Sequence, residues 1–306
     1  LGIWRHGRRD GRNAIVTTPI EHKAILGAVH QAEAEGAEVR MAEVDANCVV
    51  SAASFASHLR GDVAICSVMW VNNEIGTVQP LPDLAAVAKQ KGAVVHTDAV
   101  QAFGKVHIDA AFQQFDLLSM SGHKIGAPKG VGALFIRRGT QLEPLMHGGS
   151  QDRGRRPGTE NVAYAVGLAT ACELAIAEHD AESARLRRMR DRLEAAILAR
   201  VPDAVIHGRS AERAPHVVNV SVPGTDNESL LMALDLRGIA ASGGSACQSG
   251  SVSPSHVLLA MGVSDDLASG AIRMSLGSMT TEECIDRVSE VFPALVEKAR
   301  QFAAAG

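Results

Sequence analysis

The chain has 306 residues, of which 46% are apolar, and this is enough to build a sizeable hydrophobic core in one or two domains. A net charge of −4 and a sequence pI of about 6.3 argue against a nucleic-acid-binding protein, which would need a basic face or arm. No apolar run reaches the roughly 18 residues of a membrane span and no secretory signal opens the chain, so we expect a cytoplasmic protein without a membrane partner.

Apolar runs and helical patterns alternate over the first half of the chain, which predicts a doubly wound α/β sheet. The run at 63–71 is almost continuously apolar, as expected of a parallel strand that is covered on both faces. The expected strands are 14–18, 37–44, 63–71, 93–98, 115–120 and 131–136, with helices at 23–35, 51–59 and 81–90.

The pattern changes after residue 159, where two long helices at 160–179 and 181–200 precede short strands and further helices. This predicts a smaller α+β domain, so the expected domains are 1–176 and 177–306. Thr280 and Glu283 have capping-box spacing at the start of a terminal helix. Its apolar face is expected to contain Ile285, Val288, Val291, Phe292, Leu295 and Ala299.

A lysine and an aspartate follow two of the expected strands. Lys124 closes the sequence Ser-Gly-His-Lys, and a lysine amine, with a pKa of about 10.4, needs cationic neighbours or desolvation to attack a carbonyl. His123 and the glycine turns are candidates for that setting, whereas a solvated loop lysine is the alternative. Asp98 ends the other strand, at the edge where ligands of open α/β sheets bind. Such a pair suits pyridoxal phosphate, because the lysine holds it as a Schiff base and the aspartate keeps its ring nitrogen protonated.

Cys247 lies in the segment 241–251, in which seven of eleven residues are glycine or serine. That composition predicts an exposed, mobile loop from which a thiolate can enter a site and leave it, although an idle surface thiol is the alternative. The chain has five cysteines, an odd number without a C-x-x-C pair, which argues against a disulfide framework or a structural zinc site. The others are expected to be inert in apolar or helical settings: Cys48, Cys66, Cys172 and Cys284.

Three further polar residues stand where a structural explanation competes with a functional one. Arg273 lies inside an apolar strand and needs a carboxylate partner, either from a salt bridge or from a ligand. Asn73 follows the strand at 63–71 and is compatible with an ordinary turn. His22 ends the sequence Thr-Pro-Ile-Glu-His, and an isolated histidine is most often structural.

The Ser-Gly-His-Lys sequence at 121–124, the His-x-Asp-Ala-x-Gln sequence at 96–101 and the cysteine segment resemble those of pyridoxal-phosphate-dependent cysteine desulfurases of the NifS/IscS type. The resemblance covers nearly the whole chain. It implies a fold-type I, aspartate-aminotransferase-like architecture, with a large mixed-sheet α/β domain that binds the cofactor and a small C-terminal α+β domain that carries the catalytic cysteine. It also implies Lys124, Cys247 and His22 as the catalytic residues.

The same resemblance implies the cofactor and substrate contacts. His22 would stack on the ring, Asn73 and Gln101 would bind its phenolic oxygen, and Asp98 its nitrogen. The phosphate would be bound by Ser121 and His123, and by Thr159 of a neighbouring subunit, which implies a homodimer. Arg273, with Asn73 beside it, would bind the substrate carboxylate.

The implied reaction converts L-cysteine to L-alanine and leaves sulfur as a persulfide on Cys247, for transfer to an acceptor or scaffold protein in iron–sulfur or other sulfur-cofactor assembly. No metal is expected. The alternatives are a selenocysteine lyase, another class V aminotransferase-like enzyme and a non-catalytic scaffold that binds partners. A nicotinamide oxidoreductase is disfavoured, since no G-x-G-x-x-G follows the first strand. Family members carry a further segment upstream, with a Gly-Thr turn for the phosphate, so we expect the chain to be a fragment.

Overall fold

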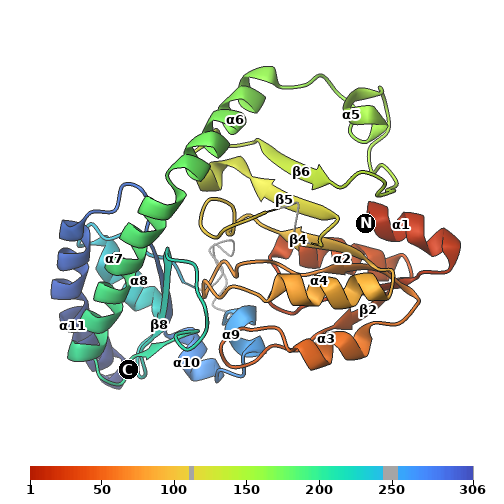
Figure 1. The fold of residues 1–306 in the computed structure, drawn as a ribbon. Coiled ribbons are helices and arrows are strands. Elements are labelled where there is room, and N and C mark those ends of the chain that lie inside the picture. Colours follow the sequence, from red (N-terminus) through yellow and green to blue (C-terminus); the bar gives the residue numbers. More distant parts are fainter. Residues whose placement is uncertain (110–113, 244–253, 306) are drawn as a thin grey trace. The chain divides into compact units, whose positions relative to one another are not determined.

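The computed structural model describes residues 1–109, 114–243 and 254–305. The chain forms two compact units, which we call the large unit (1–44, 50–71 and 79–178) and the small unit (45–49, 72–78 and 179–306). Each unit has its own sheet (Figure 1). The division into functional domains after residue 176 stays a prediction.

The large unit is built on a six-stranded sheet with the order β2-β1-β3-β4-β5-β6. The pairs from β2 to β5 are parallel, and β6 pairs antiparallel with β5, which makes the sheet mixed. The fold class predicted from the sequence is therefore confirmed. The strands are β1 (Ala14–Thr17), β2 (Glu38–Met41), β3 (Val63–Ser67), β4 (Val94–Asp98), β5 (Leu117–Ser121) and β6 (Gly132–Ile136).

Helices cover both faces of this sheet because its connections run in two directions. From β1 the chain crosses to β2 on one side, and from β3 it crosses to β4 on the other. Right-handed crossovers then place α2 (Lys23–Ala34) and α4 (Leu81–Gln90) on opposite faces. Figure 1 shows α4 with α3 (Ala52–His58) on the near face, and α2 with α1 (Gly2–Gly7) behind. The remaining helical segments are η1 (Arg8–Asp10), η2 (Gly122–Ile125), α5 (Gln151–Gly154) and α6 (Val162–Ala177).

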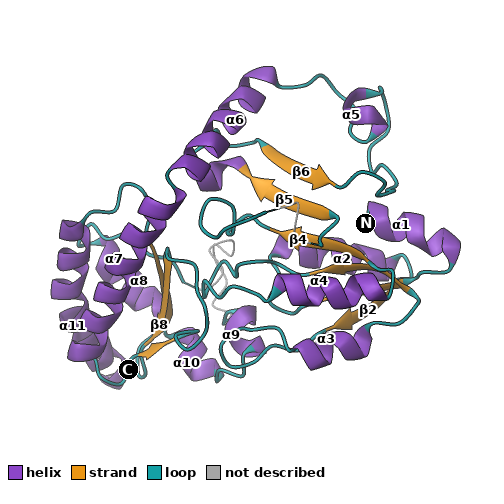
Figure 2. Ribbon diagram, viewed as in Figure 1, coloured by secondary structure: helices purple, strands orange, loops and turns teal. Residues whose placement is uncertain are grey.

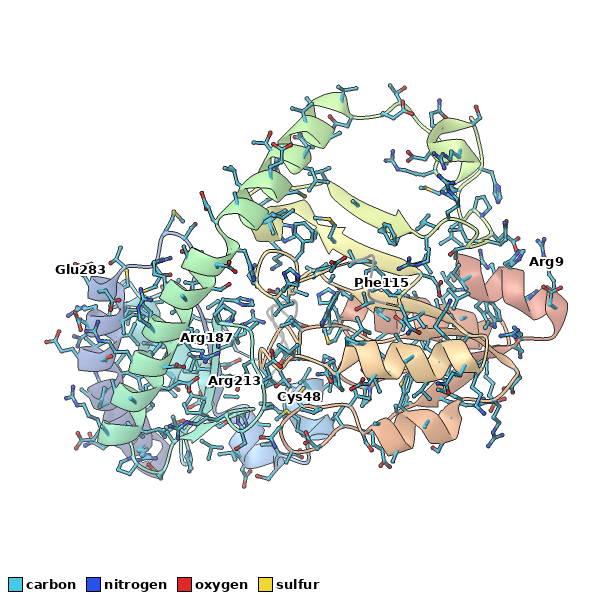
Figure 3. The ribbon with its side chains drawn as sticks, in the orientation of Figure 1. Arg9, Cys48, Phe115, Arg187, Arg213 and Glu283 are labelled. Atoms are coloured by element: carbon cyan, nitrogen blue, oxygen red, sulfur yellow. The ribbon has the colours of Figure 1, made fainter. Side chains whose placement is uncertain are left out.

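Aromatic side chains help to fix the end of the large sheet where β5 begins. Phe115, labelled in Figure 3, is buried, and its ring meets the rings of Trp70 and Phe135 edge-on, at centroid distances of 6.0 and 5.8 Å. The next residue, Asp116, is buried as well. Its carboxylate accepts hydrogen bonds from Lys89 Nζ at 2.7 and 2.9 Å and from the main-chain nitrogen of Val95 at 2.8 Å. These contacts hold β5 against β4 and α4.

The small unit packs helices on a three-stranded antiparallel sheet with the order β7-β8-β9 (Figure 2). All five residues of the central strand β8 are buried. A buried ion pair joins Glu194 to Arg213 through two hydrogen bonds of 2.7 and 3.0 Å. The helices and strands of the small unit are α7 (His179–Arg200), β7 (Val205–Ile206), β8 (Val217–Ser221), α8 (Asn227–Asp235), α9 (His256–Ala260), α10 (Asp265–Ser269), β9 (Ala271–Ser275) and α11 (Glu282–Ala305).

The terminal helix confirms its predicted apolar face and corrects its predicted cap. Ile285, Phe292 and Leu295 are buried in the core of the small unit. The helix begins one residue later than expected, and Thr281 rather than Thr280 accepts the hydrogen bond from the main-chain nitrogen of Cys284. Thr280 instead accepts from the main-chain nitrogen of Gly277, which closes the preceding turn.

Candidate functional site

The carboxyl ends of β4 and β5 bring the predicted aspartate and the predicted lysine loop to neighbouring positions in the large unit. Asp98 is the last residue of β4 and pairs in register with Ser119 of β5. The main-chain nitrogen of Ala99 donates to the Ser119 oxygen at 2.9 Å, so the pairing continues one step past Asp98. Because parallel strands end at the same edge, Asp98 and the loop after Ser121 leave adjacent strands together.

A 3₁₀ turn, η2, presents Lys124 directly after β5, and its side chain is exposed. Glycine is needed at both ends of this turn. A Cβ on Gly122 would lie 3.0 Å from Ala127 Cβ and from two atoms of Val131, and Gly126 has a left-handed φ of 86°. The sequence around Lys124 therefore encodes a tight turn that leaves the amine accessible.

Ser121 and His123 flank this turn and hydrogen-bond to each other, with 2.8 Å between Ser121 Oγ and His123 Nδ1. A hydroxyl and an imidazole held side by side are suitable donors for an anionic group such as a phosphate. The hydrogen bond directs the His123 ring to Ser121, and the influence of His123 on Lys124 stays a prediction.

Lys105 is a further cationic neighbour of Lys124, and the sequence analysis did not identify it. Its Nζ donates a hydrogen bond of 3.2 Å to the main-chain oxygen of Lys124. Burial, together with the charge of Lys124, lowers the pKa of Lys105. The turn that carries Lys105 packs closely on α6, since a Cβ on Gly104 would lie only 3.0 Å from Ala175 Cβ. The contact between the two lysines spans 19 residues of sequence, and no local pattern signals it.

Asp98 is almost completely buried, and its environment explains its suitability as a ring-nitrogen partner. Oδ1 accepts a hydrogen bond of 2.9 Å from the main-chain nitrogen of Val100. Burial raises the pKa of Asp98, while this hydrogen bond and the nearby His22 act in the opposite direction. A buried carboxylate of this kind gains most from a cationic partner such as a pyridinium nitrogen.

His22 lies in the turn between β1 and α2, where it caps the helix. Its Nδ1 accepts a hydrogen bond of 3.2 Å from the main-chain nitrogen of Ala24, which assigns the proton of the neutral ring to Nε2. The ring is thus fixed at one end and keeps a donor at the other.

Gln101 and Thr159 complete the predicted residues of the large unit. Gln101 is half-buried in the turn that follows β4, three residues after Asp98. Thr159 is exposed between α5 and α6.

Arg273 and Asn73 are brought together in the small unit. Arg273 lies half-buried in β9, and its Nη1 donates to the main-chain oxygen of Asn73 at 2.9 Å. The backbone of Arg273 pairs with Ser242 through hydrogen bonds of 2.7 and 3.0 Å. The side chain of Asn72 accepts from the main-chain nitrogens of Glu74 and Ile75, both at 2.9 Å, and so shapes the turn that holds Asn73.

Cys247 lies outside the described residues, and its predicted role stays a prediction. Cys48 and Cys66 are buried and Cys172 is half-buried. Burial raises the pKa of Cys66 to about 12. The expectation that Cys284 is a buried cysteine is wrong, because this residue lies exposed in the first turn of α11. A hydrogen bond from the Thr281 hydroxyl, together with nearby main-chain donors, lowers the pKa of Cys284.

A cavity of about 990 Å³ lies elsewhere, on the face of the large sheet. It is lined by apolar residues of α1, α2, β5 and β6 and by a polar row across β3, β4 and β5. In that row the His96 ring bridges the hydroxyls of Ser67 and Ser119, each at 2.8 Å. None of the predicted cofactor residues lines this cavity.

In the described part of the chain, no helix is both long enough and apolar enough to cross a membrane.

The side chains at the carboxyl edge of the large sheet fit pyridoxal phosphate, the cofactor that the resemblance implies. The set contains an amine for its aldehyde, a buried carboxyl group for its ring nitrogen, an imidazole beside that carboxyl group and a hydroxyl–imidazole pair for its phosphate. These groups are Lys124, Asp98, His22, Ser121 and His123. Each of these five groups is a chemically appropriate partner for the contact that is predicted for it.

Comparison with known proteins agrees with this chemistry. Residues 3–288 match the family described as Aminotransferase class-V. A cysteine desulfurase of Gluconacetobacter diazotrophicus is 46% identical over 292 residues, which cover 95% of this chain and 73% of that protein. The cysteine desulfurase NifS of Azotobacter vinelandii is 45% identical, over 94% of this chain and 72% of that protein.

A solved structure titled NifS-like protein superimposes with a TM-score of 0.86 and 34% identity, over all of this chain and 78% of that one. DndA of Streptomyces lividans superimposes with a TM-score of 0.79 and 36% identity, over 90% of this chain and 77% of that one. Fold, residue chemistry and similarity therefore agree: the chain belongs to the class-V aminotransferase family and, within it, to the pyridoxal-phosphate-dependent cysteine desulfurases.

Proposed function

We propose that this chain removes sulfur from L-cysteine, with Lys124 and Asp98 as the central pair of the cofactor site and Cys247 as the sulfur acceptor. The observation that carries the proposal is the pairing of Asp98 with Ser119, which sets the buried carboxyl group and the lysine turn on adjacent strand ends. When bound, pyridoxal phosphate supplies an electron sink for the substrate carbon.

The residues of the large unit would hold the cofactor and move one proton. Lys124 would hold the cofactor by its aldehyde, and its amine would take the proton from the substrate Cα. Asp98 would keep the ring nitrogen protonated. His22 would lie against the ring, with its Nε2–H as a proton donor to the substrate. Lys105 adds a positive charge beside the Lys124 turn.

The substrate carboxylate would bind Arg273, whose fork matches two carboxylate oxygens. Asn73 supports this arginine through its main-chain oxygen. In the sulfur step the Cys247 thiolate attacks the substrate sulfur, an S–S bond forms and the C–S bond breaks. The bonding electrons stay on the substrate carbon, which takes up a proton and leaves as alanine. The persulfide on Cys247 then passes to an acceptor or scaffold protein for iron–sulfur or other sulfur-cofactor assembly.

A homodimer is part of the proposal, because α6 is apolar on nearly all sides. Only Leu168 and Ala171 of this 16-residue helix are buried within the described structure. A helix that is apolar all round is normally enclosed by protein. Large apolar side chains on α6 are exposed instead: Val162, Tyr164, Val166, Leu174 and Ile176. A second copy that covers α6 would also bring Thr159, just before it, to the neighbouring phosphate. A molar mass of two chains by light scattering supports this, and a monomer at micromolar concentration contradicts it.

The cysteines of the described residues are all free thiols, which supports a reducing, cytoplasmic compartment as the place of action. The experiment that tests the activity is a product assay with pyridoxal phosphate, cysteine and a thiol reductant. Alanine and sulfide in equal amounts are expected. Pyruvate or an amino-group transfer product without sulfide would favour the aminotransferase alternative, and a strong preference for selenocysteine would favour the lyase.

A further inference from the structure

Glu21 is a completely buried carboxyl group that the proposed reaction does not use, with 0% of its surface exposed. It immediately precedes His22 in the turn between β1 and α2. Burying a carboxyl group is costly unless the group is hydrogen-bonded or uncharged, so its retention beside the candidate cofactor site calls for an explanation.

The hydrogen bonds of Glu21 show that it continues the sheet where β1 has ended. Beyond β3, the main-chain nitrogens of Val68 and Trp70 donate to β4, at the oxygens of His96 and Asp98. The nitrogen of Met69 between them therefore points to the opposite side, where β1 has already ended at Thr17. Glu21 Oε1 accepts from that nitrogen at 2.8 Å.

Two threonines complete this extension of the β1–β3 pairing. Thr18 Oγ1 donates to Glu21 Oε1 at 2.8 Å, which fixes the carboxyl group within its own turn. Thr17 Oγ1 donates to the main-chain oxygen of Ser67 at 2.9 Å. Side chains thus take over from backbone groups at the strand end, and the turn that carries His22 is fastened to the segment after β3.

The charge state of Glu21 matters for Asp98, because the two carboxyl groups interact. Burial raises the pKa of Glu21 to about 8, and the charge of Asp98 from β4 acts in the same direction. The charge of His22, which lies on the same turn as Glu21, lowers the pKa of Asp98. At neutral pH Glu21 is then uncharged. Of the two carboxyl groups, Asp98 is the one that carries the negative charge.

We propose that Glu21 is a positioning residue for the cofactor site: as an uncharged carboxyl group it fastens the His22 turn to the end of β3 and keeps the negative charge on Asp98. This inference rests on the proposed cofactor role of Asp98 and His22. A glutamine matches an uncharged glutamic acid in shape and keeps its acceptor oxygen, whereas alanine removes the acceptor of the Met69 nitrogen.

The first test measures urea unfolding of the cofactor-free chain between pH 5 and pH 8 for the wild type, Glu21→Gln and the control Glu33→Gln, an exposed residue of α2. A carboxyl group whose folded pKa lies above its unfolded value stabilises the fold fully below the unfolded value. That stability is lost as pH rises toward the folded pKa. The unfolding constant of the wild type should therefore rise, relative to that of Glu21→Gln, by roughly tenfold per pH unit. Equal pH dependence in the two proteins would overturn the proposal, and Glu33→Gln should follow the wild type.

The second test measures the dissociation constant of pyridoxal phosphate and the circular dichroism of the bound cofactor. Glu21→Gln should stay within about threefold of the wild type, and Glu21→Ala should bind at least tenfold more weakly with a changed dichroism band. Equal binding by both variants would overturn the positioning role. A wild-type chain that does not bind the cofactor would instead contradict the proposed function, and the unfolding test remains valid in that case.

Discussion

Asp98 faces Ser119 across the parallel pairing of β4 and β5, and the Lys124 turn starts three residues after that serine. Backbone pairing thus brings the strand ends that carry the two proposed cofactor groups, Asp98 and Lys124, to the same edge of the sheet. Ligands of open α/β sheets bind at the carboxyl ends of the strands, where such side chains lie.

Asp98→Asn should lower kcat/KM by about 10- to 100-fold, because a hydrogen bond to a charged group contributes about 1.5 to 3 kcal/mol. The amide oxygen still accepts from the Val100 nitrogen, so the fold should be unchanged. Steady-state kinetics and the absorbance of the bound cofactor check both points. Asp83→Asn, an exposed position on α4, is the matched control. Wild-type kinetics in Asp98→Asn would show that Asp98 has no role in the cofactor site.

Arg273→Lys should raise KM for cysteine by about 10- to 100-fold with a smaller effect on kcat, since lysine keeps the charge and loses the two-point fork. The variant also loses the hydrogen bond to the Asn73 oxygen. Arg287→Lys, on the exposed side of α11, is the control. An unchanged KM would mean that Arg273 serves only the structure of the small unit.

Cys247→Ser should retain the absorbance of the bound cofactor and release no sulfide, because the hydroxyl cannot form a persulfide. Cys284→Ser is the control that the structure requires, since Cys284 is also an exposed thiol with a lowered pKa. It should keep full activity. If sulfide release depends on Cys284 and persists without Cys247, the assignment of the sulfur acceptor is wrong.

His96 predicts acid sensitivity of the large unit. Burial lowers the pKa of His96 to about 4, so the unfolded chain binds a proton more readily than the folded chain between pH 6.5 and pH 4. Stability should therefore fall as pH falls through this window, by about 1.4 kcal/mol per pH unit for this group. His96→Asn should show a smaller fall in unfolding free energy, measured with urea, than the control His30→Asn on the exposed face of α2. Parallel curves for both variants would contradict this.

Much of the large unit is predictable from local sequence. Helix α4 has the predicted bounds, and β1 and β3 begin at the predicted residues, because their apolar runs are bounded by clear turn and cap residues. The predictions for β1, β2 and β3 extend too far at their carboxyl ends, whereas those for β4 and β6 end at the observed residues. Residues 68–71 are apolar and buried but no longer pair with β1, which ends at Thr17, although Val68 and Trp70 still donate main-chain hydrogen bonds to β4.

Helices whose backbone departs from the usual pattern could not be predicted. In α5, Asp152 and Arg153 have left-handed φ values of 47° and 58°, a conformation that is uncommon outside glycine. The caps also shift by single residues, as Thr281 shows, because adjacent threonines compete for one helix end.

The residues of the candidate site also fall into two groups, those that the sequence identifies and those that only the structure reveals. Lys124, Asp98 and Arg273 stand in recognisable sequences at strand ends or within strands. Lys105 and Glu21 act through contacts across 19 and 48 residues of sequence, and their importance comes from burial and charge. Only the folded chain reveals such contacts.

The most direct test of the central claim is to reduce the cofactor-loaded protein with borohydride, which fixes the cofactor to its lysine, and to map the modified peptide by mass spectrometry. The account predicts that the label lies on Lys124 and is absent from Lys124→Ala. A label on Lys105 or Lys129 of the wild-type protein, or none at all, would contradict it.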